Sequence, residues 1–454
     1  MKAFLGYVGV AIGLLGVAIG LLGMGYWFPR TAFPELMGLY GIAFISYLTL
    51  VSVHKNKAFS SLVVIIMAMV LRLLLLGAWP ELSDDFYRYL FDGQLLVKGV
   101  NPYLQMPADL FDSGILPDNR YWQTLLERMN SSEYYSLYPP LHQFFFWIAA
   151  LAGENLFLNM LVLRISILLI EGVNLWLIQK ILFLWRKPAY HLSWYAFNPL
   201  VIMELTGNLH FEGLVLTGLL AAVYFYSTQK VFGTALSWAA AVGLKLTPLL
   251  LAPVWIRFWD KKRFLIFSIT AVFFVLLFLS PIFLLEGGEN YYQSFRLFQI
   301  KFEFNASLYY LIREISGFFV DYNPIAYVGP AFQVFAAICL LAMGLYQRTY
   351  TQEALVSKMV WMYLVFLLLQ TTVHPWYLIP ALGISVLTSN RIFVVWTGLV
   401  FLSYHAYSQP AFKENLWIIT AEYVLLGVAG LLILYRDFSS RRILSSRASS
   451  QGEL

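Results

Sequence analysis

Long apolar runs dominate the pattern of hydrophobic and polar positions along this chain of 454 residues. The runs recur from end to end, and many are about 17–25 residues long, which at about 1.5 Å per residue matches a hydrocarbon core about 30 Å thick. Stretches such as 264–285 are apolar on every side, whereas a strand of a membrane barrel alternates apolar and polar residues. The pattern therefore predicts an all-α bundle of membrane-spanning helices.

We expect about fourteen spans, with twelve and thirteen as alternatives. Several runs are shorter than a full crossing, and the pairs interrupted at Thr247-Pro248 and at Pro375 are alternatively half-helices that meet near one face. The predicted ranges are 4–24, 35–53, 60–78, 158–184, 192–206, 211–227, 232–245, 248–259, 263–284, 325–346, 354–372, 377–388, 391–406 and 416–435.

The basic residues predict the orientation, because Lys and Arg in short loops favour the cytoplasmic side. With the N-terminus inside, one side receives the basic segments 54–57, 186–187 and 260–263, together with Arg348, Arg391, Arg436, Arg441, Arg442 and Arg447. Two long segments, 79–157 and 286–324, then lie outside. We predict a single membrane domain over 1–437 and a disordered cytoplasmic tail over 438–454.

Composition supports a multi-pass membrane protein and excludes other classes. The chain is 60% hydrophobic and only 12% charged, with a mean hydropathy of +0.70, and no water-soluble fold could bury so much apolar surface. The net charge of +5 comes from residues scattered at the ends of apolar runs, so we expect no nucleic-acid partner. The single cysteine, Cys339, gives neither a disulfide framework nor a cysteine-based metal cage.

The first outer segment, 79–157, is the most acidic part of the chain. Ser83-Asp84-Asp85 is typical of a helix start, and Tyr138-Pro139-Pro140 opens a short apolar helix that we expect to lie along the membrane interface. Adjacent carboxylates outside the membrane could act as a general base or bind a divalent cation. The structural alternative is that they cap the helix and complement its dipole.

Motifs spread over nearly the whole chain carry a resemblance to a known superfamily. They are Ser83-Asp84-Asp85-Phe86-Tyr87-Arg88-Tyr89-Leu90-Phe91-Asp92-Gly93, Gly99-Val100-Asn101-Pro102-Tyr103, Tyr138-Pro139-Pro140-Leu141, Phe197-Asn198-Pro199, Gly243-Leu244-Lys245-Leu246-Thr247-Pro248, Phe304-Asn305-Ala306-Ser307-Leu308-Tyr309-Tyr310 and His374-Pro375-Trp376-Tyr377. The chain resembles the GT-C membrane glycosyltransferases, and among them the bacterial polyprenyl-phosphate-mannose-dependent mannosyltransferases. The first motif is the most specific of the set.

The resemblance implies an active site at the outer membrane surface. There an acidic residue after an early span deprotonates the acceptor hydroxyl, and the sugar leaves a polyprenyl phosphate with inversion. Asp85 is the first choice for this base and Asp84 the second. One departure is that two spans precede the one that leads into the acidic loop, whereas many relatives have a single span there. On this comparison the first two helices are an accessory addition with no assigned role.

Three cationic or imidazole side chains are candidates for binding the donor phosphate: Lys245, His374 and Arg296. A buried ammonium such as that of Lys245 needs a partner, which is either a lipid phosphate or a neighbouring carboxylate. His374 is alternatively a turn histidine capped by the backbone. Arg296 lies in the second outer segment with Lys301 and Arg313, and an interfacial basic segment would look the same.

A second set of residues is predicted to bind the acceptor or the sugar: Arg88, Tyr138, Asn208, His210 and Glu212. Simple solvation of an outer turn is the alternative for Asn208, His210 and Glu212. Arg164 and Glu171 are seven residues apart on one helix face, and we expect structural pairing there, with Arg164 nearer the site.

The sequence therefore favours a membrane glycosyltransferase that moves a sugar, mannose first, from a polyprenyl phosphate to a glycan or glycolipid acceptor. The alternatives are a related transferase of another sugar such as a pentose or glucose, and a transporter or lipid-linked sugar flippase. Transport is disfavoured because the acidic cluster is in an outer loop and no internal repeat is evident. We expect a bacterial plasma membrane with the site on the outer face, and leave metal dependence and protein partners unassigned.

Overall fold

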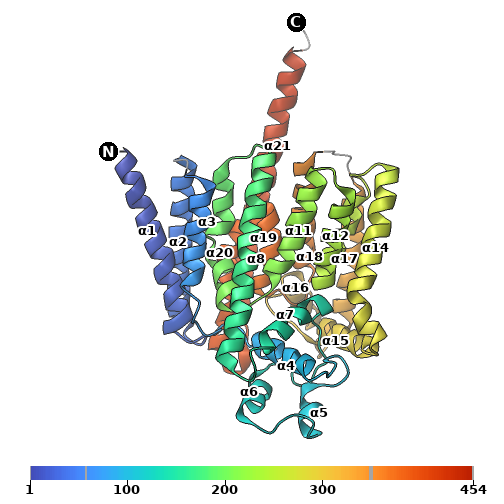
Figure 1. Ribbon diagram of the computed structural model, residues 1–454. Helices are drawn as coiled ribbons and strands as arrows, with labels where there is room; N and C mark the ends of the chain where they lie inside the picture. Colours follow the sequence, from blue (N-terminus) through green and yellow to red (C-terminus); the bar gives the residue numbers. More distant parts are fainter. Residues whose placement is uncertain (1, 57–58, 347–350, 452–454) are drawn as a thin grey trace.

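The computed structural model describes residues 2–56, 59–346 and 351–451, and these form a bundle of helices (Figure 1). Within this part of the chain, six helices are long and apolar enough to cross a membrane, or seven if a pair bent by 118° counts as one span. The six are α1 (Lys2–Leu22) with its extension η1 (Gly23–Trp27), α2 (Phe33–Asn56), α8 (Leu156–Leu184), α14 (Lys261–Leu284), α17 (Ile325–Leu345) and α21 (Leu416–Gln451).

Shorter helices complete the bundle: α3 (Ser61–Leu73), α11 (Glu212–Ser227), α12 (Val231–Leu244) and α18 (Gln352–Leu368). Four of the predicted spans, 192–206, 248–259, 377–388 and 391–406, are each built from two or more short helical pieces. These pieces are η2 (Ala189–Leu192), α9 (Ser193–Ala196), α10 (Pro199–Val201), η3 (Ile202–Gly207), η4 (Thr247–Leu251), α13 (Ala252–Trp255), η5 (Pro375–Leu378), α19 (Ile379–Ser385), α20 (Ile392–Leu399) and η6 (Val400–Ser408).

Proline explains several of these interruptions. Pro199, Pro248 and Pro375 each stand in the first turn of a new piece, where the missing N–H and the fixed φ are tolerated. The predicted breaks at Thr247-Pro248 and Pro375 are present, but the pieces are shorter than full spans. The count of about fourteen separate crossings therefore overstates the number of continuous helices.

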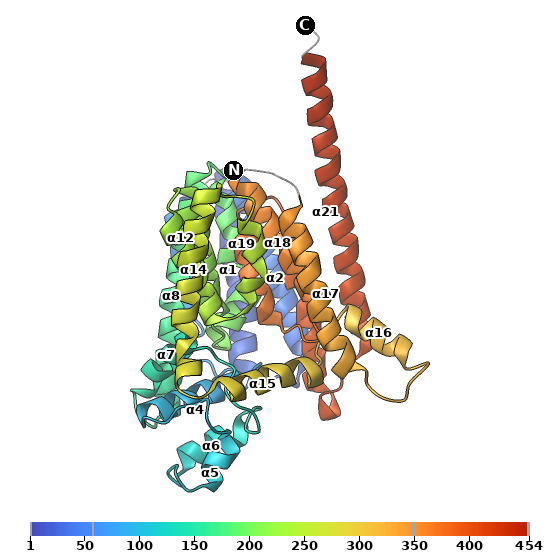
Figure 2. The same cartoon turned by 90° about the vertical axis from the view of Figure 1, so that its right-hand side faces the viewer.

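The end of the bundle away from both termini carries a layer of shorter helices (Figures 1 and 2). It contains α4 (Asp85–Val97), α5 (Pro107–Asp112), α6 (Arg120–Arg128), α7 (Pro140–Ala150), α15 (Gly288–Lys301), α16 (Leu308–Ser316) and η7 (Pro410–Phe412). Both predicted outer segments, 79–157 and 286–324, supply this layer. The basic ends of α2 and α8 lie at the opposite end, so the acidic loop and the basic loops are on different faces.

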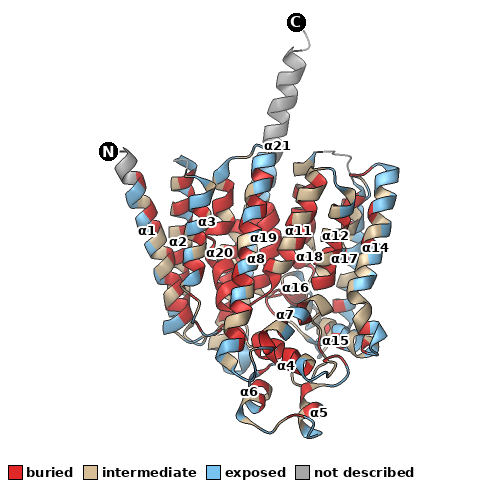
Figure 3. Cartoon of the chain, viewed as in Figure 1, coloured by how far each residue is buried: buried red, intermediate tan, exposed pale blue. Residues whose placement is uncertain are grey.

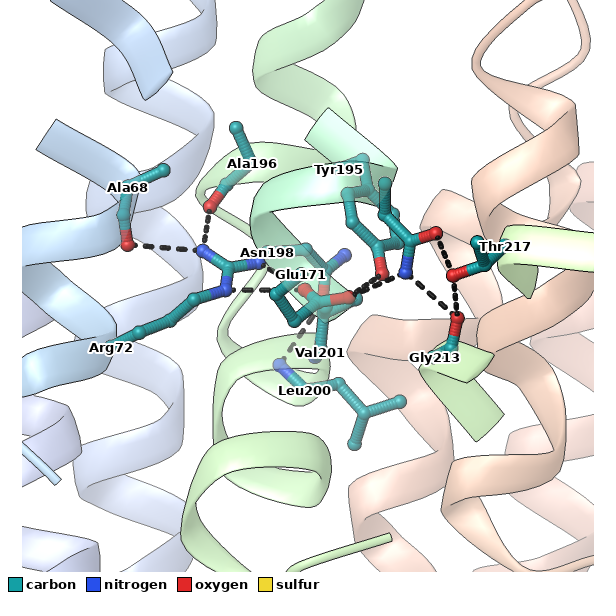
Figure 4. Close-up of polar contacts among 11 residues, drawn as sticks. Ala68, Arg72, Glu171, Tyr195, Ala196, Asn198, Leu200, Val201, Gly213 and Thr217 are labelled. Carbon is teal, nitrogen blue, oxygen red and sulfur yellow. Dashed lines mark hydrogen bonds and ion pairs between the residues drawn. The ribbon is translucent and has the colours of Figure 1, made fainter. Parts of the chain in front are cut away.

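Buried residues gather along the middle of the bundle and in α4, whereas exposed residues cover α1, α14 and the outer rims (Figure 3). At the centre, the carboxylate oxygen Oε2 of Glu171 accepts hydrogen bonds from Arg72 Nε and Nη2, at 3.1 and 2.8 Å, and both side chains are fully buried. Arg72 also donates to the carbonyls of Ala68 and Ala196, and Tyr195 donates to Glu171 (Figure 4). Glu171 therefore has a structural ion-pair partner in the bundle, as expected, and that partner is Arg72.

The last helix differs from the prediction for the tail. α21 continues as a helix to Gln451, through most of the segment 438–454 that was predicted to be disordered, and 452–454 lie outside the described residues. A helix that is already formed adds residues without a new nucleation cost, and Leu, Ala and Arg favour its extension. The side chains after Arg436 are not described.

Glu171→Ala should destabilise the bundle strongly, because it leaves the Arg72 guanidinium buried without its carboxylate. We expect a loss of about 3–5 kcal/mol, measured as thermal unfolding in detergent. The double variant Arg72→Met with Glu171→Leu should lose less, since neither charge is then stranded. Lys187→Ala is the matched control, because its ion pair with Glu353 is 22% and 41% exposed and should contribute little. Equal stability of Glu171→Ala and wild type would contradict the assignment.

Candidate active site

The start of α4 places two carboxylates at the end of the bundle away from both termini. Asp84 occupies the N-cap position and Asp85 the first helical position, with side chains 28% and 22% exposed. The Asp84 side chain makes no capping hydrogen bond; instead its Oδ2 lies 2.6 Å from Arg30 Nη1. Capping is therefore not what holds the Asp84 carboxylate in place.

Asp85 lies between an amide and an imidazole. Its Oδ1 accepts a hydrogen bond from Asn130 Nδ2 at 3.3 Å, and its Oδ2 lies 3.8 Å from His210 Nε2. Burial raises the pKa of the Asp85 carboxyl, and nearby His210 and Asn130 oppose that rise. A raised pKa and partial exposure are the properties expected of a carboxylate that accepts a proton.

His210 connects Asp85 to a buried carboxylate. The imidazole is 1% exposed, and its Nδ1 lies 3.2 Å from Oε2 of the fully buried Glu204. Asn208 Nδ2 and the Tyr404 hydroxyl also donate to Glu204. A buried carboxylate beside the imidazole favours its protonated form, whose Nε2–H lies 3.2 Å from the hydroxyl of Ser83, with Asp85 Oδ2 farther away at 3.8 Å.

The predicted acceptor-binding role of Asn208 and His210 does not fit this burial. Both side chains are buried, and both contact the Glu204 carboxylate. Asn208 Oδ1 also accepts a hydrogen bond from the backbone N–H of Leu82. Their polar atoms are used inside the protein, so they support the site and are not presented to a sugar. The sequence showed that the turn was polar, but it could not show which way the side chains point.

Arg164 holds together the two chain segments that carry Asp85 and His210. Its guanidinium is fully buried and donates to four carbonyl oxygens, those of Leu76, Ala78, Thr206 and Gly207, at distances of 2.7–3.1 Å. The first two carbonyls follow α3 and precede the acidic pair, while the other two end η3 just before Asn208 and His210. The prediction that Arg164 lies near the site is confirmed, although its partners are carbonyls and not a carboxylate.

Lys245 forms an ion pair with Glu212 at 2.6 Å, and its ammonium lies 4.0 Å from the centre of the Tyr377 ring. The Lys245 side chain is 31% exposed, whereas Glu212 is 8% exposed. Of the two partners that the sequence left open for Lys245, the structure contains the neighbouring carboxylate. Tyr377 also contacts the ring of Trp376, which stacks on His210 beside Asp85, so the ion pair and the acidic pair border the same region.

His374 lies in a stack of rings that reaches His210. Its ring is 4.4 Å from that of Trp376, which stacks on His210 at 3.7 Å, and on its other side Phe304 lies at 4.9 Å. Burial lowers the pKa of His374 to about 3, with His210 and Lys245 as further causes, so the imidazole is neutral. Its Nδ1 is buried without a hydrogen-bond partner among the described residues, which leaves one position open for a ligand or water.

Three predicted residues lie apart from this cluster or have another role. Arg296 is exposed on α15. Arg88 pairs with Asp92 at 2.6 Å and donates to the carbonyls of Ser131 and Tyr134, which braces the outer loop. The Tyr138 ring packs against Tyr89, and burial raises the pKa of its hydroxyl well above 10. Arg88 is therefore a structural residue, and its burial does not fit an acceptor-binding role.

Sequence reasoning missed Arg30, Asn130 and Trp376 as parts of the site. Trp376 belongs to the motif His374-Pro375-Trp376-Tyr377, but its contact with His210 joins residues that are far apart in the chain. Arg30 stands 54 positions before Asp84, and no local sequence signal connects the two. Among the residues that the structure describes, no group of three or more His, Cys, Asp and Glu side chains has a metal-binding arrangement.

Comparison with known proteins places these residues in a family. The family model described as "Alpha-(1->6)-mannopyranosyltransferase, N-terminal domain" matches residues 17–261, a range that contains Arg30, both aspartates and Lys245. Alpha-(1->6)-mannopyranosyltransferase A of Corynebacterium glutamicum is 31% identical over 202 residues, which are 42% of this chain and 38% of the relative. A probable alpha-(1->6)-mannopyranosyltransferase of Mycolicibacterium smegmatis is 28% identical over 185 residues, 37% of this chain and 30% of the relative.

The similarity covers well under two thirds of either curated relative. Both relatives are named as alpha-(1->6)-mannopyranosyltransferases, one of them as probable, and the family match extends over more than half of the 454 residues. This chain therefore belongs to the alpha-(1->6)-mannopyranosyltransferase family.

Proposed function

We propose that this protein transfers a mannosyl group from a polyprenyl-phosphate donor to a hydroxyl of a glycan or glycolipid, at the membrane surface that carries α4. The family membership supports mannose as the sugar, and the relatives' names suggest an alpha-(1->6) linkage. The observation that carries the proposal is the Asp85 carboxylate, partly exposed at this surface and supported by His210 and Asn130. The site lies at the end of the bundle opposite the basic loops, so we assign it to the non-cytoplasmic side.

In the proposed reaction the acceptor oxygen attacks the anomeric carbon of mannose. A new carbon–oxygen bond forms, the bond from that carbon to the phosphate oxygen breaks, and the phosphate leaves with the bonding electron pair. Asp85 takes the proton of the acceptor hydroxyl. Attack from the side opposite the phosphate inverts the anomeric centre, so a β-linked donor gives an α-linked product.

The phosphate gains charge as it leaves, and a nearby cation stabilises that charge. We assign this role to Lys245, whose side chain is partly exposed and whose ammonium lies 4.0 Å from the centre of the Tyr377 ring. A bound phosphate would share the ammonium with Glu212. Neutral His374, with its unpartnered Nδ1, is the second candidate for contact with the donor.

Asp85→Asn should lower mannosyl transfer by about 10²–10⁴-fold, since the amide cannot accept the proton. The assay uses purified protein, a polyprenyl-phosphate mannose and a short mannoside acceptor, with radiolabelled product as readout. Asp84→Asn is the matched control and should keep most of the activity. If Asp85→Asn retains most of the wild-type rate, Asp85 is not the base.

His210→Gln should move the acid limb of the pH–rate profile to higher pH. The imidazolium opposes the rise in the pKa of Asp85, so without it that pKa is higher, and the base is active only above its pKa. His54→Gln, a buried histidine at the far end of α2, should leave the profile unchanged. A profile that stays in place in His210→Gln would show that this imidazole does not act on Asp85.

Lys245→Ala should raise the apparent KM for the donor by about tenfold or more, with little change for the acceptor, because one charge-assisted contact to phosphate is lost. Lys98→Ala is the control, since Lys98 also pairs with a carboxylate, Glu154, at 3.7 Å on the same face. An unchanged donor KM in Lys245→Ala removes Lys245 from the phosphate site.

A further inference from the structure

The turn between α1 and α2 brings a cation to the acidic pair. Arg30 Nη1 lies 2.6 Å from Asp84 Oδ2, across 54 positions of sequence, and the guanidinium lies 5.0 Å from the centre of the Tyr407 ring. Arg30 is 32% exposed. A pair with this exposure contributes little to stability, so its placement beside two aspartates suggests a role in the chemistry of the site.

The helix pair that carries Arg30 is closely packed. A stripe of glycines on α1 lies against α2, and a Cβ added at Gly16 would stand 2.0 Å from Ser46 Oγ, while one at Gly20 would stand 2.7 Å from the carbonyl oxygen of Leu39. Close approach of this kind is how helices associate in a membrane. The α1–α2 hairpin is therefore a defined unit and not two loosely attached helices.

α2 is in turn fixed to the core of the bundle. The Tyr40 hydroxyl donates to the carbonyl of Thr397, the Tyr40 ring stacks on Phe401 at 4.0 Å, and the Tyr47 hydroxyl donates to the carbonyl of Trp194. At the outer end, the Tyr26 hydroxyl donates to the carbonyl of Leu74, at the end of α3. The position of the turn relative to Asp84 is thus set by contacts at both ends of the hairpin.

Two adjacent carboxylates repel each other's negative charge, and each makes the other a stronger proton acceptor. The two differ in their partners: Asp84 has a close full cation in Arg30, whereas Asp85 has an amide at 3.3 Å and an imidazole at 3.8 Å. The other charged or titratable groups that act on Asp85 or are acted on by it include Glu212, Tyr377 and Tyr407. Arg30 is the group that forms an ion pair with Asp84.

We propose that the α1–α2 hairpin is part of the active site, and that Arg30 is a positioning residue which neutralises Asp84 and so leaves Asp85 as the single base. This inference rests on the proposed transferase function. It replaces the interpretation of the first two helices as an accessory addition, and the family match from residue 17 onward already includes α2 and the turn. In this role Arg30 acts through Asp84 and does not contact the substrate.

The test is a double-mutant cycle on the full chain in the mannosyl-transfer assay. Arg30→Gln should move the acid limb of the pH–rate profile upward by about one unit, so that kcat at a fixed pH on that limb falls by about tenfold, because the charge of Asp84 is no longer compensated. Adding Asp84→Asn should restore both values to near those of Asp84→Asn alone. Arg30→Lys keeps the charge and should stay close to wild type.

Arg120→Gln is the matched control, an exposed arginine on α6 in the same outer layer, and should leave kcat and the profile unchanged. Size-exclusion profiles and thermal unfolding check that each variant is folded. If Arg30→Gln does not fold, two other comparisons decide the test: Arg30→Lys against wild type, and the double variant against Asp84→Asn. A double variant as impaired as Arg30→Gln, with a raised donor KM, would overturn the proposal and indicate direct contact with phosphate. So would an Arg30→Gln variant with wild-type kcat and pH profile.

The two proposals fail in different ways. Wild-type protein without mannosyl transfer, or full activity of Asp85→Asn, contradicts the proposed function. Transfer that depends on Asp85 but is indifferent to Arg30 contradicts only the role of the hairpin.

Discussion

The geometry of the candidate site depends on one buried cation whose partners are all main-chain oxygens. Arg164 donates to carbonyls after α3 and at the end of η3, and these segments lead directly to Asp85 and to His210. Helix ends leave carbonyls without intrahelical donors, and a guanidinium has enough N–H groups to serve several of them at once. An unpaired charge here would be costly, so the two segments are held at a fixed separation.

Around this anchor the charges form an alternating series. Glu204 lies beside His210, His210 beside Asp85, and Arg30 beside Asp84, while Lys245 and Glu212 form a further pair. Opposite charges in contact are what allow so many ionisable groups to share a poorly solvated region. Within this series the partly exposed Asp85 differs from Asp84, because its nearest cationic group, His210, lies 3.8 Å away, whereas Arg30 lies 2.6 Å from Asp84.

Much of the fold could be predicted from the sequence, because apolar runs and basic loop ends are local signals. The long spans α2, α8, α14 and α17 lie close to their predicted ranges, and the start of α4 at the aspartates was expected. The short ranges were harder to predict as spans. A run interrupted by proline is as apolar as a membrane span, but it does not form one continuous helix. Side-chain partners could not be predicted, because pairs such as Arg30 with Asp84 join residues far apart in the chain.

The lack of information about side-chain partners also explains why the sequence predicted that His210 binds the acceptor, whereas the structure buries its side chain. Hydropathy shows that a turn is polar, but not whether its polar atoms face water or another carboxylate. For Lys245 the two possible partners gave the same sequence pattern, and the structure was needed to show that the Glu212 carboxylate is one of them.

The isolated bridge between Phe304 and Thr372 gives the second outer segment a mechanical connection to the imidazole beside Asp85. Two main-chain hydrogen bonds join the strand-like stretch around Phe304 to residues Thr371 and Val373, and the Phe304 ring begins the stack that ends on His210. Displacement of α15 or α16 must therefore either break this short ladder or shift the stacked rings with it. The segment 286–324 is in this way coupled, through stacked aromatic rings, to the imidazole that lies beside the carboxylate of Asp85.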